Sequence, residues 1–241
     1  MKNKMALSKQ QIEDAFNLFY ENCTAIPHSR YKSWEHCKLV FNAAFEDIKN
    51  GKYTYETVPF EVLDYLCLNL GFYLASWGMM RGSTDLLQRD YKIHAKAIPV
   101  ILKYYELNDL DIMHLKDNYY LNKVMELTKE IRKAYLRDSQ NPLSDMSDTL
   151  ETKIIMGTLG IVPAYDDFVK DALKYYDFYG ASGLYTTNSL KKLSLYFTQK
   201  DLDELIIELQ NKMNTHSSTL VFYPKTKIVD MILWELGSTL Q

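Results

Sequence analysis

The stretch Lys153–Val169, KIIMGTLGIVPAYDDFV, decides how the second half of this 241-residue chain folds. Apolar residues at helical spacing lead to Gly160, a residue that often ends helices, and then to a short turn that contains Pro163. Asp166 and Asp167 stand where the next helix starts, because a carboxylate there accepts hydrogen bonds from free backbone N–H groups. The pattern predicts two helices joined by a tight turn, with a carboxylate beside a packed core.

Helical periodicity continues outward from this stretch in both directions. The pattern indicates a first helix capped by Ser8 and further helices at about 33–49, 59–81, 84–99, 119–137, 149–159, 166–178, 188–198, 200–213 and 225–237, with Pro99 as a kink or stop. It indicates one or two short helices over 101–115. The only run with strong β-propensity, Thr219–Tyr223, is too isolated to make a sheet. The sequence therefore predicts an all-α fold over residues 1–241, as one multi-helix globular domain or as two helical lobes that divide in the 138–148 loop.

Composition narrows the class of protein. Apolar residues make up 47% of the chain and charged residues 24%, which is typical of a globular protein, and the net charge of −3 argues against non-specific coating of nucleic acid. Three widely spaced cysteines and an N-terminus without a signal peptide favour a reduced, cytoplasmic protein. The uncharged run Tyr65–Met80 is shorter than the roughly 20 residues of a membrane span, so no membrane association is expected.

The order Gly160, Pro163, Asp166 resembles the helix-hairpin-helix DNA glycosylases, in which an apolar helix ends in glycine and a Pro-containing turn delivers an aspartate. The C-terminal VDMILWELG, Val229–Gly237, is similar to a terminal helix of outlying members of that superfamily. The resemblance covers roughly the last ninety residues. It implies that Asp166, or less readily Asp167, serves in cutting a base from its sugar.

Two features of that family are missing from the sequence. No Gly-hydrophobic-Gly hairpin, whose backbone amides would bind a DNA phosphate, precedes Lys153, and no lysine stands near Ser147–Thr149, where lyase-competent members carry their nucleophile. The resemblance therefore points to a related fold with altered or absent activity and speaks against the lyase reaction. An alternative role for Asp166 is to cap the helix that follows it and nothing more.

Two other short segments concentrate side chains that suit a ligand site. In Arg30–Cys37, RYKSWEHC, Glu35 or His36 can line a pocket as acid or base, or Trp34 can simply anchor the start of a helix. In Ser76–Ser83, SWGMMRGS, Arg81 stands between glycines, where it can hold an anionic ligand or pair with an internal carboxylate. A cavity formed by Arg81, Trp77, Glu35 and His36 would require these two segments to meet.

A basic stripe lies on the expected helix at 119–137. Lys129, Arg132 and Lys133 share one face, which can contact phosphates or can be an ordinary solvated face with local ion pairs. The histidines form no metal-binding pattern, and no phosphate loop, nucleophile elbow or dinucleotide fingerprint appears, so neither a metal nor a cofactor is expected.

Three functions remain open from the sequence. The first is a nucleic-acid-linked protein of glycosylase-like architecture with altered or absent activity, and its partner would be nucleic acid. The second is a structural or interaction protein without catalysis, which would bind a protein partner or form a homo-oligomer. The third is a small-molecule-binding or enzymatic helical domain.

Overall fold

The computed structural model describes residues 7–81, 84–137, 143, 145–179, 184–216 and 218–240. Within these residues the chain forms ten α-helices, four short 3₁₀-helices and no strand, which confirms the all-α prediction. The α-helices are α1 (Lys9–Thr24), α2 (Lys32–Lys49), α3 (Phe60–Ser76), α4 (Ala97–Lys103), α5 (Asn118–Leu136), α6 (Asp148–Thr158), α7 (Asp167–Tyr175), α8 (Thr187–Phe197), α9 (Lys200–Asn214) and α10 (Lys225–Ser238). The 3₁₀-helices are η1 (Asp85–Gln88), η2 (Tyr91–His94), η3 (Tyr105–Asp109) and η4 (Ile112–Lys116).

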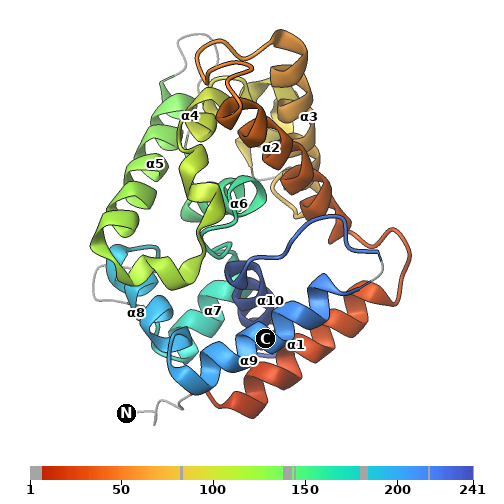
Figure 1. The fold of residues 1–241 in the computed structure, drawn as a ribbon, viewed down its shortest axis with the longest axis vertical. Helices are drawn as coiled ribbons and strands as arrows, with labels where there is room; N and C mark the ends of the chain where they lie inside the picture. Colours follow the sequence, from red (N-terminus) through yellow and green to blue (C-terminus); the bar gives the residue numbers. More distant parts are fainter. Residues whose placement is uncertain are drawn as a thin grey trace.

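Helix α6 lies in the middle of the molecule, with α2 to α5 toward one end and α7 to α10 toward the other (Figure 1). The N-terminal helix α1 does not join its neighbours in sequence but packs against α9 and α10 (Figure 1). The predicted lobe boundary at 138–148 falls largely outside the described residues and stays a prediction. No helix in the described part of the chain is long and apolar enough to cross a membrane.

Helix starts follow the capping residues. Ser8 caps α1 by accepting a hydrogen bond from the N–H of Gln11 (3.2 Å), while the Gln11 side chain accepts from the N–H of Ser8 (2.9 Å). Asp166 caps α7 in the expected place, with its side chain accepting from the N–H of Val169. Caps of this kind, from Ser147, Asp166 and Thr186, explain why α6, α7 and α8 begin within a residue of the predicted positions.

Two of the expected helices before residue 100 differ from the prediction. Helix α3 ends at Ser76 instead of Arg81 because Gly78, with φ +78°, turns the chain out of the helix. The expected helix at 84–99 is replaced by η1 and η2, since the Asp90 side chain accepts from the N–H of Lys92 and starts a new turn there. Pro99 lies in the first turn of α4, where its missing N–H costs nothing, so it neither kinks nor ends that helix.

From Leu150 in α6 through the turn to Tyr165, every residue is buried. Side chains therefore replace water as partners for the backbone of the turn. The Thr152 hydroxyl accepts from the N–H of Tyr165 (2.8 Å), and Asp230 Oδ1 on α10 accepts from the N–H of Ala164 (2.8 Å). Lys38 Nζ on α2 donates to two carbonyls at the end of α6 (3.0 and 2.9 Å). These bonds tie α2, α6 and α10 together around the turn.

Helices α7 and α10 approach so closely that only glycine fits at Gly237. A Cβ atom there would lie 1.8 Å from the carbonyl oxygen of Phe168. Gly237→Ala would raise helix propensity, so any loss of stability must come from this clash. We expect Gly237→Ala to lower the free energy of unfolding by about 1–3 kcal/mol or more, measured by urea denaturation.

The matched control is Ser238→Ala, one position further along α10, which lies near the surface. That change should stay within about 0.5 kcal/mol of wild type. Equal stability of Gly237→Ala and wild type would contradict the close approach of the two helices.

Candidate functional site

The carboxylate of Asp166 makes two different contacts with its two oxygens. Oδ1 accepts from the N–H of Val169 (3.2 Å) and so caps α7, while Oδ2 lies 3.3 Å from the Nζ of Lys153 on α6. The sequence presented the cap and a role at a site as alternatives. The structure shows that the cap leaves one oxygen available, and that this oxygen faces an amine.

Lys153 is almost completely buried, with 5% of its side chain exposed, and its Nζ also donates to the carbonyl of Trp77 (2.9 Å). Burial lowers the pKa of Lys153, although Asp166 opposes this shift. Burial likewise raises the pKa of Asp166, against the effect of Lys153. Because the two pKa values are moved toward each other, a proton can pass between the amine and the carboxylate at a lower cost than between exposed groups.

A second buried pair lies behind the first. On α10, Lys227 Nζ contacts Asp230 Oδ2 (2.7 Å), and the other oxygen of Asp230 holds the turn through Ala164. Lys227 Nζ also lies over the rings of Trp34 (5.3 Å) and Trp77 (5.5 Å). Lys227 and Asp230 balance each other's charge, and Asp230 also holds the turn. We therefore assign this pair a supporting role next to Lys153 and Asp166.

Lys153 and Asp166 line a cavity of about 360 Å³ at the junction of α3, α6, α7 and α10. Trp234 and Phe168 meet edge to face on one wall, with ring centroids 5.0 Å apart. The buried indole N–H of Trp77 has no hydrogen-bond partner among the described residues. The cavity is lined by Arg30, Trp77, Gly78, Met79, Arg81, Thr84, Thr149, Lys153, Asp166, Asp167, Phe168 and Trp234.

The structure brings together some of the residues that the sequence indicated. Trp77, Arg81 and Asp166 line the same cavity, with Asp167 at its edge. Glu35 and His36 are not among the described residues that line it. Glu35 is buried and accepts from the hydroxyl of Tyr223 (2.7 Å), which makes it a tie between α2 and the segment before α10.

The basic stripe on α5 lies apart from this cavity. Lys129 and Lys133 are exposed, whereas Arg132 pairs with the buried carboxylate of Glu151 (2.5 Å). Burial raises the pKa of Glu151 to about 7, with Arg132 acting in the opposite direction. Arg132 therefore links α5 to α6, which restricts its freedom to contact phosphate.

Sequence reasoning missed Lys153, Lys227, Asp230 and Arg30. The signal for the first three was a charged residue inside a helix that is otherwise apolar, since such a residue must find a partner or a function. The family carries its lysine near the position of Ser147–Thr149, whereas the lysine that meets Asp166 comes one turn of helix later. No sequence signal would have found Arg30, because its place depends on how the α1–α2 loop lies.

Comparisons of the chain with protein-family models, with curated proteins and with solved structures give no match. The site must accordingly be interpreted from its own geometry. Within the part of the chain that the structure describes, no cluster of three or more His, Cys, Asp or Glu side chains could hold a metal ion. The residues that line the cavity offer an amine, two carboxylates, aromatic rings and two guanidinium groups.

The pairing of Lys153 with Asp166 predicts how the amine titrates. Asp166→Asn keeps a side chain that can cap α7 but removes the negative charge that opposes the lowering of the Lys153 pKa. We therefore expect the pKa of Lys153 to fall further in this variant. The measurement is the rate of Lys153 acetylation as a function of pH, read by mass spectrometry, in which the rise in rate should move to lower pH.

Asp167→Asn is the matched control, because Asp167 is the exposed neighbour with the same charge. Its acetylation profile should match that of wild type. An unchanged profile in Asp166→Asn, or an equal shift in both variants, would show that the ion pair does not govern this amine.

Proposed function

We propose that this protein acts on an N-glycosidic bond, with Lys153 as the nucleophile and Asp166 as its proton acceptor. The observation that carries the proposal is the buried contact of 3.3 Å between these two groups on the wall of a cavity. The resemblance of the Gly160–Asp166 turn to the helix-hairpin-helix DNA glycosylases supports this proposal. Lys153 supplies the amine that is missing near Ser147–Thr149.

A buried lysine is suited to nucleophilic chemistry. Only the neutral amine has a lone pair to donate, and burial lowers the pKa of Lys153 so that more of it is neutral near neutral pH. Active-site lysines in other enzymes are activated by the same desolvation. The carbonyl of Trp77 and the carboxylate of Asp166 fix the direction of the amine, which reduces the entropic cost of attack.

The rest of the cavity suits a base attached to a sugar. Trp77, Trp234 and Phe168 offer ring faces and edges to a flat heterocycle, and base–aromatic stacking is worth about 1–3 kcal/mol. Arg30 and Arg81 line the same cavity and can bind a phosphate attached to the sugar.

The reaction follows from these positions. The lone pair of Lys153 Nζ forms a bond to the anomeric carbon while the bond from that carbon to the base nitrogen breaks. The base leaves with the bonding electron pair, and the carboxylate of Asp166 accepts the proton that Nζ loses. Opening of the sugar ring then gives an imine between Lys153 and the sugar, which borohydride reduces to a stable amine.

The imine provides the test. We expect borohydride to cross-link the protein to a single-stranded oligonucleotide with one abasic site, since the aldehyde of that site condenses with an amine to form an imine and water. Peptide mapping should locate the cross-link at Lys153. Lys153→Met should reduce the yield by about 100-fold or more, because it removes the amine that forms the imine. Asp166→Asn should reduce it by a smaller factor, because the amine remains and loses only its proton acceptor.

Lys170→Gln is the matched control, since Lys170 lies beside the site and donates to Thr149 (2.7 Å) without reaching the carboxylate of Asp166 in any described contact. This variant should retain the cross-link. A cross-link spread over surface lysines, with equal yield in Lys153→Met, would rule out the proposed nucleophile. Release of free base from oligonucleotides that carry uracil, hypoxanthine or 8-oxoguanine would then identify the base.

A further inference from the structure

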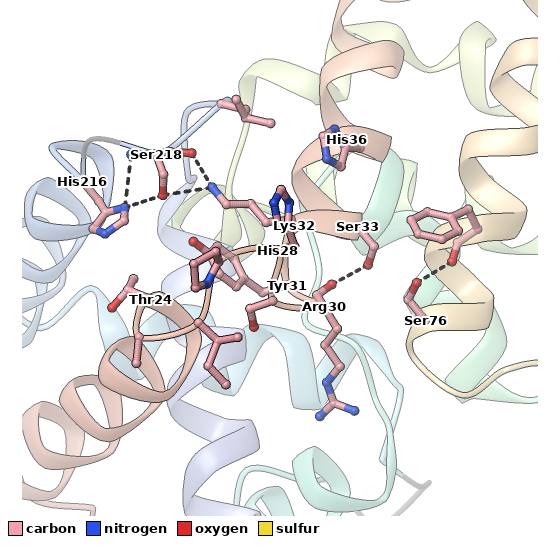
Figure 2. Close-up of a pocket in the computed structure, with 16 residues that line it drawn as sticks. Thr24, His28, Arg30, Tyr31, Lys32, Ser33, His36, Ser76, His216 and Ser218 are labelled. Carbon is pink, nitrogen blue, oxygen red and sulfur yellow. Dashed lines mark hydrogen bonds between the residues drawn. The ribbon is translucent and has the colours of Figure 1, made fainter.

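A second and larger hollow lies between the end of α1, the start of α2 and the segment after α9, and we call it the α1–α2 groove. Its volume is about 920 Å³, within the usual range for small-molecule sites. Figure 2 shows Lys32 reaching from the start of α2 toward Ser218 and His216, with His36 on the opposite side. The lining residues are Thr24, Ala25, Ile26, Pro27, His28, Ser29, Arg30, Tyr31, Lys32, Ser33, His36, Phe72, Ser76, His216, Ser218 and Leu220.

The charged side chains among the described residues that line the groove are all positive. No Asp or Glu occurs among the described residues that line it, while the basic ones are His28, Arg30, Lys32, His36 and His216. This contrasts with the chain as a whole, which carries a net charge of −3. Arg30 and Lys32 are the cations among them, and without a carboxylate on the same wall they attract an anion from solution.

Lys32 and Arg30 are held in different ways. Lys32 Nζ contacts the buried carboxylate of Glu35 (2.9 Å) and also reaches the carbonyl and hydroxyl of Ser218, so part of its charge is balanced from behind. Arg30 is exposed, and no ion pair to it occurs among the described residues. Its guanidinium lies 4.8 Å from the ring centroid of Trp77, a contact that orients the group and leaves its positive charge in place.

Exposed apolar side chains line the same groove. Ile26, Phe72 and Leu220 are 63%, 58% and 47% exposed. They form a surface on which a ring or an alkyl group can lie beside the cations. The groove thus combines an anion site with an apolar wall, as a site for a nucleotide-like compound would.

We propose that the α1–α2 groove binds the phosphate groups of a small phosphorylated ligand, with Arg30 as the principal cation, Lys32 as a second cation on the same lining and the imidazole of His36 as a hydrogen-bond donor. Arg30 also lines the cavity that contains Lys153 and Asp166, so it is the residue common to both hollows. The proposal does not depend on chemistry at Lys153.

Isothermal titration calorimetry at about 0.15 M salt, where exposed charges are screened beyond about 8 Å, tests it with three probes: ADP, inorganic tripolyphosphate and a ten-nucleotide single strand of dT. We expect ADP or tripolyphosphate to bind. The affinity should fall by about tenfold or more in Arg30→Gln/His36→Gln, since hydrogen bonds to charged groups contribute about 1.5–3 kcal/mol. Both replaced side chains are exposed, and thermal melting should confirm that the variant folds.

Lys9→Gln/Lys200→Gln removes two exposed cations at the opposite ends of α1 and α9 from the groove. Lys9 begins a 16-residue helix and Lys200 a 15-residue one, so each lies about 22–24 Å from the groove end of its helix. This control should bind the probe as wild type does. Lys153→Met should also bind it unchanged, which separates this proposal from the proposed function.

The three probes separate the sources of the phosphate. Tighter binding of ADP than of tripolyphosphate supports a nucleotide, and equal binding supports a small polyphosphate. Binding of the oligonucleotide alone overturns the proposal of a small ligand. Absence of binding by any probe, or an equal loss in Arg30→Gln/His36→Gln and the distant control, overturns the assignment of the groove.

Discussion

The turn between α6 and α7 is buried, and the rest of the structure depends on giving its backbone hydrogen-bond partners. A buried N–H or carbonyl without a partner costs about 1–3 kcal/mol, and water is excluded from this turn. The partners come from distant parts of the chain: Lys38 on α2, Thr152 on α6 and Asp230 on α10. Each of these side chains is itself buried, so the helices that carry them must dock in one relative position.

The same constraint positions the candidate site. Asp166 follows the turn directly, and its N–H donates to the carbonyl of Ala164 (2.8 Å), whose own N–H is held by Asp230. Lys153 lies on the helix that precedes the turn, so the pair is set by a short, fully buried stretch of chain. Rigid support of this kind is what a nucleophile and its proton acceptor need, because small displacements are costly in rate.

Local patterns predicted what depends on local chemistry. The helices from α5 to α10 and the capping roles of Ser8 and Asp166 follow from spacing and from hydrogen bonds within a few residues. The region of residues 85–94 was predicted wrongly, because the side chain of Asp90 competes with helical hydrogen bonding. The cavity could be predicted only in part, since the meeting of Trp77 with Asp166 requires α3 to pack against α6, and no local pattern predicts that packing.

The position of α1 has a consequence for how the chain acquires its structure. Tyr196 donates to the carbonyl of Leu7 across 189 positions of sequence, and Lys212 donates to Asn17 across 195. Contacts of such high sequence separation are slow to form, because the entropy cost of closing the long intervening loop comes before any stabilisation from the contact. During synthesis, α1 is made well before α9 and α10, the helices against which it packs. Its apolar face therefore stays uncovered until those two helices have been made, and this half of the molecule cannot fold earlier.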